Sequence, residues 1–178
     1  PPILDKLIES NRIGQKTKAG FYQKNEDQTI HSVDLNTGEY SPVKKVRFDC
    51  LRVAKDSQKL ERKILALCNG DDRGSKYFWE VTSRTLIYTA NRIPEISDDI
   101  INVDNALRWG FGWDAGPFEF WDMLGVETSI SRMVVEGKKV PEWVTKMVGM
   151  GRKSFYEIHD GQKSYWCAVD NKPVSYTH

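Results

Sequence analysis

The sequence lacks several features that would assign it to a class at once. Its three cysteines, Cys50, Cys68 and Cys167, lie far apart without C-x-x-C spacing, which argues against a disulfide framework or a zinc knot. Its 26 Lys and Arg residues balance 25 Asp and Glu residues, and no run of like charges occurs. Nucleic acid and anionic membrane are therefore not expected as partners.

Long apolar runs are also absent. None comes near the roughly 20 residues that a transmembrane helix requires, and no basic leader precedes an apolar stretch at the start. The unpaired cysteines indicate a reducing, cytoplasmic compartment. Because the sequence begins with Pro1 and not with Met, we expect that Pro1 is not the natural N-terminus.

What is present is the composition of a folded globular protein, with 39% hydrophobic and 29% charged residues in 178 positions. Apolar spacing predicts mainly helical structure with two small hairpins, near 20–40 and 155–166. The expected helices cover 1–10, 57–68, 78–91, 97–110, 117–124, 126–137 and 141–149.

The long helix at 78–91 and its successor allow specific predictions. Alignment of four side chains predicts the buried face of the long helix, which Pro94 should end: Phe78, Val81, Thr85 and Tyr88. Ser97 is the expected N-cap of the next helix, whose first turn holds two aspartates.

An internal repeat organises the chain. PPILDKLIESNR at the start aligns without a gap to PEWVTKMVGMGR at 141–152, and each copy is followed by a Phe-Tyr pair and a hairpin. Chance similarity over twelve positions is the alternative to a duplicated helical unit. We therefore predict three parts: the end of a first repeat at 1–45, a connector with a helix at 46–75, and a second repeat at 76–178.

The stretch GFGWDAG at 110–116 is a near miss to the dinucleotide fingerprint G-x-G-x-x-G. A dinucleotide loop leaves a strand and enters a helix, whereas this stretch follows a predicted helix. We interpret it as a corner between helices, with Gly116 as the cap and Pro117 in the first turn. The aromatic residues between Phe111 and Trp121 exceed what one small helix can bury, so we expect another protein surface to cover some of them.

Two motifs carry a resemblance to a known family. NALRWGFGWDAGPFEFWDMLGV resembles the signature of the C-terminal helical domain of L-3-hydroxyacyl-CoA dehydrogenases, and NRIGQKTKAGFY is similar to the element that closes that domain. Their order resembles the tandem-repeat members of the multifunctional β-oxidation type. The resemblance implies a helical bundle of the 6-phosphogluconate dehydrogenase C-terminal-like type, acting on acyl-CoA with NAD.

The resemblance also implies which functional groups lie elsewhere. The family's Rossmann domain, which binds NAD and carries the catalytic His and Glu, has no counterpart here, so we expect that domain as a partner and no cofactor, catalytic residue or metal site in this segment. The histidines at 31, 159 and 178 are interpreted as solvated. The family's catalytic Asn falls near Trp79-Glu80 here, and Asn91-Arg92 is interpreted as a capping or surface pair.

The function implied is therefore the non-catalytic C-terminal portion of an NAD-dependent L-3-hydroxyacyl-CoA dehydrogenase of fatty acid β-oxidation. Substrate contact is assigned to Gly116, Pro117 and Phe118, for which a buried structural turn is the alternative. A dimer is a further possibility. The alternative function is a stand-alone helical module that binds another protein.

Overall fold

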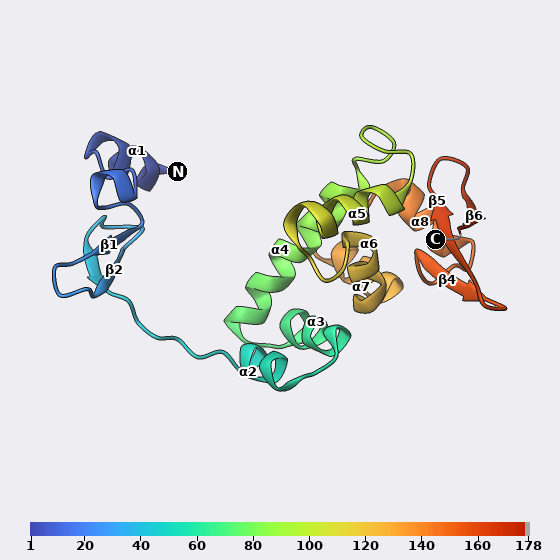
Figure 1. The fold of residues 1–178 in the computed structure, drawn as a ribbon, viewed down its shortest axis with the longest axis horizontal. Helices are drawn as coiled ribbons and strands as arrows, with labels where there is room; N and C mark the ends of the chain where they lie inside the picture. The colour runs from blue at the N-terminus through green and yellow to red at the C-terminus, as the bar shows by residue number, and fades with distance from the viewer. Residues whose placement is uncertain (177–178) are drawn as a thin grey trace. The chain divides into compact units, whose positions relative to one another are not determined.

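The computed structural model describes residues 1–176 and forms two compact units. Unit 1 comprises Pro1–Arg47, and unit 2 begins at Phe48 (Figure 1). Each unit has its own apolar core. The predicted division at residues 45 and 75 remains a prediction, although the helices of the 46–75 segment pack within unit 2.

Unit 1 is a short helix followed by a small sheet. Its elements are α1 (Pro2–Glu9), the 3-10 turn η1 (Gln15–Thr17), β1 (Tyr22–Lys24), β2 (Ile30–Val33) and β3 (Tyr40–Pro42). The strands are antiparallel in the order β1-β2-β3. The predicted hairpin is thus present with one strand more. Ile3 and Leu7 of α1 and Val33 of β2 form the core of this unit.

Unit 2 is a helical bundle with a terminal sheet. Its helices are α2 (Asp49–Asp56), α3 (Leu60–Asn69), α4 (Arg73–Ala90), α5 (Ile100–Phe111), α6 (Pro117–Leu124), α7 (Val126–Val135) and α8 (Glu142–Gly149). Its antiparallel sheet has the order β4 (Tyr156–His159), β5 (Gln162–Cys167) and β6 (Lys172–Ser175). The predicted mainly α fold with small β elements is confirmed.

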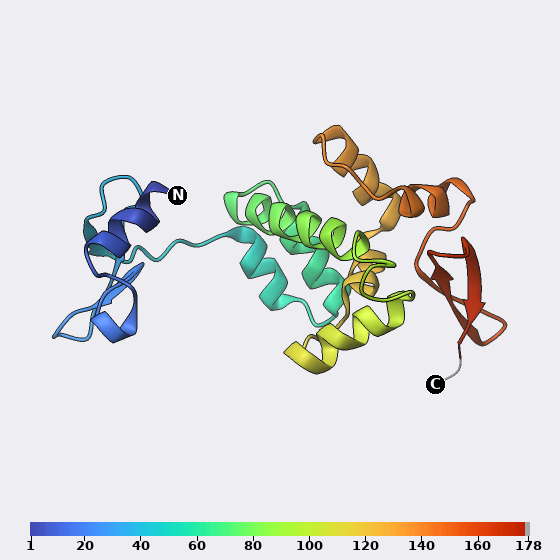
Figure 2. The same cartoon turned by 90° about the horizontal axis from the view of Figure 1, so that it is seen from above.

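Helix α6 occupies the middle of unit 2. It contacts α3, α4, α5 and α7 (Figure 2). Its sequence, PFEFWDML, places apolar side chains around most of the helix, and a helix of this kind is expected to be buried. Phe118 and Trp121 of α6 are completely inaccessible to solvent.

The predicted buried face of α4 is wrong. Val81 and Tyr88 are exposed, and the side chains that face the core form another stripe: Trp79, Ser83, Leu86 and Ala90. Both stripes have helical spacing, so periodicity alone does not choose between them.

Two helix starts also differ from prediction. Helix α4 begins at Arg73, because the Asp72 side chain accepts a hydrogen bond from the amide of Ser75 and caps the helix there. Helix α5 is capped by Asp99, which accepts from the amide of Asn102, and not by Ser97. Among the described residues, no helix is both long and apolar enough to cross a membrane.

Candidate functional site

The corner between α5 and α6 holds the residues that the sequence singled out. Helix α5 ends at Phe111, and Gly112 follows in the left-handed conformation with φ 67°. Gly116 caps α6 with Pro117 in the first turn, as predicted. Glu119 completes the cap, because its Oε2 accepts a hydrogen bond of 2.8 Å from the amide of Gly116.

Asp104, on α5, joins this corner to the C-terminal sheet. Its carboxylate accepts hydrogen bonds from the amides of Phe118 at 2.8 Å and Glu119 at 3.1 Å, and from the hydroxyl of Tyr156 at 2.8 Å. Burial raises the pKa of Asp104 to about 7, against the opposing effect of these donors. Gly116 is required beside it, since a Cβ there would lie 2.2 Å from the Cβ of Asp104.

Asp122, on α6, binds the backbone at the start of the C-terminal sheet. Its two carboxylate oxygens accept hydrogen bonds from the amides of Phe155 at 2.7 Å and Tyr156 at 2.9 Å. Burial raises the pKa of Asp122 to about 7 as well, and the nearby charge of Asp104 acts in the same direction. We call Asp104, Asp122 and Tyr156 the carboxylate clamp.

An aromatic cluster fills the space below the clamp. The ring of Phe155 lies 5.0 Å from that of Phe118 and 5.3 Å from that of Trp121, measured between centroids. Both contacts have the inclined geometry that aromatic pairs prefer. The Trp121 indole donates to the hydroxyl of Ser129 at 2.6 Å, so its polar edge is satisfied inside the core.

The residues predicted to contact substrate belong to this interior. Gly116, Pro117 and Phe118 are all buried, and Phe118 has no exposed surface. Within unit 2 these residues therefore support the corner from inside. A cavity of about 370 Å³ lies beside them, with Arg108, Glu119 and Tyr156 in its wall.

The clamp residues were not predicted. Asp122 stands in the quoted signature, but no role follows for it from the sequence, because its partners are backbone amides 33 and 34 residues away. For Asp104 the sequence contains one indication of a buried role: it is a charged residue on the same side of α5 as Ile100 and Val103. A carboxylate in an apolar stripe requires donors, and these define its neighbours.

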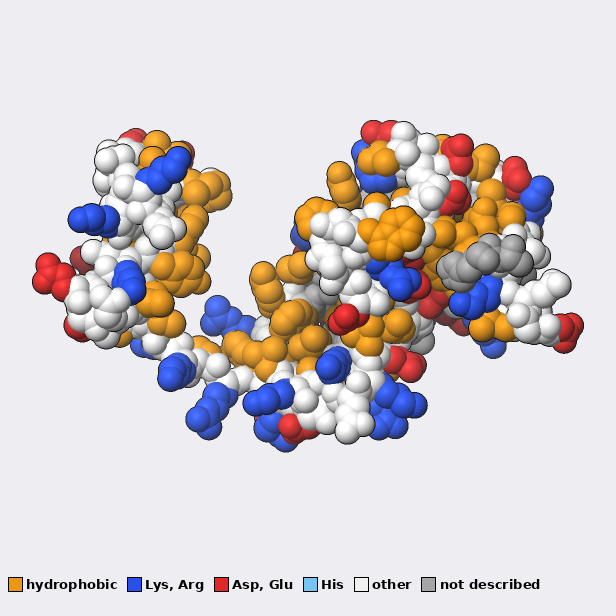
Figure 3. Space-filling model, viewed as in Figure 1, with side chains coloured by type: hydrophobic (Ala, Val, Ile, Leu, Met, Phe, Trp, Pro, Cys, Tyr) orange, Lys and Arg blue, Asp and Glu red, His pale blue; other side chains and the backbone are white. Residues whose placement is uncertain are grey.

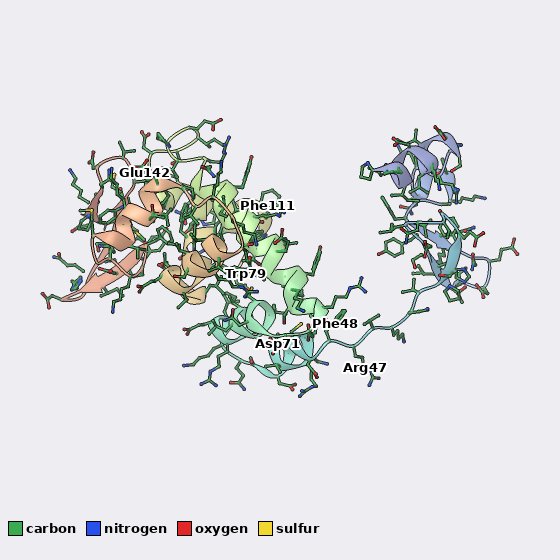
Figure 4. The ribbon with its side chains drawn as sticks, turned by 180° about the vertical axis from the view of Figure 1, so that it is seen from behind. Arg47, Phe48, Asp71, Trp79, Phe111 and Glu142 are labelled. Atoms are coloured by element: carbon green, nitrogen blue, oxygen red, sulfur yellow. The ribbon has the colours of Figure 1, made fainter. Side chains whose placement is uncertain are left out.

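The predicted aromatic surface is present at the same corner. Trp109 is 80% exposed and Phe111, labelled in Figure 4, is 76% exposed. Apolar side chains of α4 are exposed too, namely Tyr77, Val81 and Tyr88. Hydrophobic side chains gather on the surface of unit 2 in the space-filling view (Figure 3). Exposed aromatic groups of this size are typical of surfaces that another protein covers.

The remaining candidate residues have structural partners. Asn91 is the C-cap of α4, where its Nδ2 donates to the carbonyl of Ile87 at 2.9 Å. The Trp79 indole is buried and donates to the carboxylate of Glu136. His31 lies in β2 and His159 in β4, while His178 lies outside the described residues. In residues 1–176, no three His, Cys, Asp or Glu side chains are grouped so that they could hold a metal ion.

Comparison with known proteins identifies the relationship. A Bacillus subtilis protein named as a probable 3-hydroxyacyl-CoA dehydrogenase is 37% identical over 93% of this chain. This chain is homologous to part of the 3-hydroxyacyl-CoA dehydrogenases. Two rickettsial proteins agree: proteins of Rickettsia felis and Rickettsia prowazekii, each named as a putative fatty acid oxidation complex trifunctional enzyme, are 31% and 28% identical over 66% of the chain.

The match covers a minor part of each relative. The chain spans 21% of the Bacillus dehydrogenase and 15% of each rickettsial enzyme. It corresponds to the C-terminal helical portion of this dehydrogenase family, as the two motifs predicted. No protein-family profile matches the chain, and no solved structure does.

Proposed function

We propose that this chain is the non-catalytic helical part of a cytoplasmic, NAD-dependent enzyme of fatty acid β-oxidation that converts L-3-hydroxyacyl-CoA to 3-ketoacyl-CoA. The observation that carries the proposal is the 37% identity to the Bacillus dehydrogenase across 93% of the chain. The names of the rickettsial relatives support the same metabolic role.

The described residues do not fit NAD themselves. A dinucleotide loop connects a strand to a helix, whereas the Gly110–Gly116 stretch connects α5 to α6. The amides at the start of α6 are occupied as well, because those of Phe118 and Glu119 donate to Asp104. We therefore assign NAD to a Rossmann domain in the remainder of the longer protein, and no redox step to this chain.

The proposed contribution of the chain is a rigid wall and a docking surface. The carboxylate clamp and the buried aromatic cluster fix the corner, so the surface above it can line an acyl-CoA cleft without moving. In this proposal Gly116, Pro117 and Phe118 support the wall from beneath. The exposed Trp109 and Phe111 then pack against the Rossmann domain or against the same surface in a dimer.

The first test is the activity of the chain alone. The purified 178-residue chain, mixed with NAD and a 3-hydroxyacyl-CoA, should produce no NADH, while the full-length protein should produce it under the same conditions. Turnover by the chain alone would refute the non-catalytic assignment.

The second test separates this role from that of an independent module. In the full-length protein, Trp109→Ser combined with Phe111→Ser should lower dehydrogenase activity and the unfolding temperature, because a covered apolar contact is lost. Val135→Ser is the matched control, since Val135, the last residue of α7, is an apolar side chain that is 88% exposed. Unchanged activity in the double variant, together with loss of binding to another protein, would favour the module.

A further inference from the structure

Unit 1 repeats the local structure that ends unit 2, but without the helix that covers it there. Helices α1 and α8 end alike. The amides of Ser10 and Asn11 donate to the carbonyls of Lys6 and Ile8, and the amides of Met150 and Gly151 donate to those of Lys146 and Val148. The next residue is left-handed in both, Asn11 with φ 54° and Gly151 with φ 87°.

The first strands correspond as well. The amide of Val33 donates to the carbonyl of Phe21 at 3.0 Å, and the amide of Trp166 donates to the carbonyl of Phe155 at 2.9 Å. The next residue of each, Tyr22 or Tyr156, then begins the edge strand of its sheet. The Phe-Tyr pair therefore has the same backbone setting in both units.

In unit 2 this setting is covered by α6. Phe155 is completely buried against Phe118 and Trp121, and both amides of the Phe-Tyr pair donate to Asp122. One helix thus supplies two aromatic rings one turn apart and a carboxylate immediately after the second ring. These three groups are the complement of the Phe-Tyr element.

In unit 1 the same positions are open. Phe21 is 45% exposed where Phe155 is fully buried, and Leu4 is 38% exposed where Val144 is fully buried. Leu4, Leu7, Ile8, Ile13 and Phe21 line an apolar groove of about 250 Å³, which we call the α1 groove.

The donors of the Phe-Tyr pair are open too. Among the residues that the structure describes, the amide of Phe21 has no hydrogen-bond acceptor. Tyr22 and Ser32 follow the bonded pair of Phe21 and Val33 in the ladder, so the amide of Tyr22 points away from β2. A partner that covers the groove must supply a hydrogen-bond acceptor for these amides, because a buried amide without an acceptor is costly.

We propose that the α1 groove binds an amphipathic polypeptide helix with the pattern of α6, in which two aromatic residues three positions apart precede an aspartate. The aromatic side chains fill the groove over Leu4 and Phe21, and the aspartate accepts from the amides of Phe21 and Tyr22. This surface lies in unit 1 and does not depend on the function proposed above for the corner of unit 2.

The test uses the whole chain and a peptide with the sequence of residues 115–126, locked as a helix by a covalent link between positions 119 and 123. Circular dichroism confirms that the peptide is helical. Titration into the ¹⁵N-labelled 178-residue chain should shift the amide resonances of Phe21 and Tyr22. A peptide carrying Asp122→Asn should bind about tenfold more weakly, because the amide has one neutral acceptor oxygen where the carboxylate has two charged ones.

Two chain variants complete the experiment. Phe21→Ala should abolish binding, and Tyr77→Ala, which removes an exposed aromatic residue of α4 in unit 2, should leave it unchanged. The proposal is overturned if the helical peptide, at about 1 mM, shifts neither amide or shifts only resonances of unit 2. Equal binding of the two peptides would show that the carboxylate does not accept from the amides of Phe21 and Tyr22, and would overturn the proposed pattern of two aromatic residues and an aspartate.

Discussion

The carboxylate clamp should make the stability of unit 2 depend on pH. Burial raises the pKa of Asp104 and of Asp122 from 3.8 to about 7. A carboxyl group whose pKa is raised on folding contributes stability that is fully present below pH 4. That stability is lost as the pH rises through 7, because the unfolded chain ionises first. Between pH 5 and pH 8, each group acting alone would cost about 3 kcal/mol.

The other shifted groups do not obscure this window. Glu136 and Glu80 have pKa values below their ordinary range, because of hydrogen bonds to basic groups, and Lys138 has a raised pKa. Their titrations therefore fall below pH 5 or above pH 10. The two clamp carboxylates repel each other, so the total loss is not a simple sum.

The perturbation that isolates the clamp is Asp122→Asn. At pH 5 the wild-type Asp122 is mostly protonated, and an amide closely resembles it, so both proteins should fold. Between pH 5 and pH 8 the variant should lose about 3 kcal/mol less than the wild type. Glu127→Gln, an exposed change on α7, should keep the wild-type dependence.

The assay is urea unfolding followed by tryptophan fluorescence. All six tryptophans lie in unit 2, so the signal reports that unit alone. The free energy of unfolding is measured at pH 5, 6, 7 and 8 for the three proteins. A wild-type stability that rises with pH, or a variant with the same slope as the wild type, would refute the argument.

Four further substitutions, one of them a control, test the corner by urea unfolding. Gly116→Ala should lower the free energy of unfolding by about 3 kcal/mol or more, since the added Cβ would overlap Asp104. Gly110→Ala is the control: the space around Gly110 is open, so the added Cβ should stabilise α5 by about 0.5 kcal/mol. Equal effects of the two substitutions would refute the clash. Tyr156→Phe should cost about 2 kcal/mol at pH 8 through the lost hydrogen bond to Asp104, and no change would show that the bond contributes nothing. In the isolated chain, Trp109→Ser should change stability by less than about 0.5 kcal/mol, because the side chain is 80% exposed there; a larger loss in the isolated chain would place this residue in the core.

Local patterns predicted what depends on neighbouring residues. Helices α3, α7 and α8 lie where apolar spacing and glycine or proline boundaries placed them, since these signals act within a few residues. The corner was predicted for the same reason: Gly116 and Pro117 cap α6 through their own backbone preferences. Helix α2 at Asp49–Asp56 was not predicted, because only Cys50 and Ala54 are buried in it.

Features that depend on distant residues could not be predicted from the sequence. The apolar residues of α4 form more than one stripe, and its partners decide that Trp79 and Leu86 face inward while Tyr88 does not. The same holds for the clamp, whose donors and acceptors lie up to 52 residues apart. A pattern of residue types does not contain these pairings; only the packed helices bring them together.

The signature at 110–125 can now be explained residue by residue as a description of packing. A glycine is needed at 116 because Asp104 occupies the space of a side chain, and Glu119 is needed to accept from the amide of that glycine. Asp122 is needed to accept from the Phe-Tyr pair. Each of these three partners is a group of unit 2, so these positions of the motif join α5, α6 and the terminal sheet.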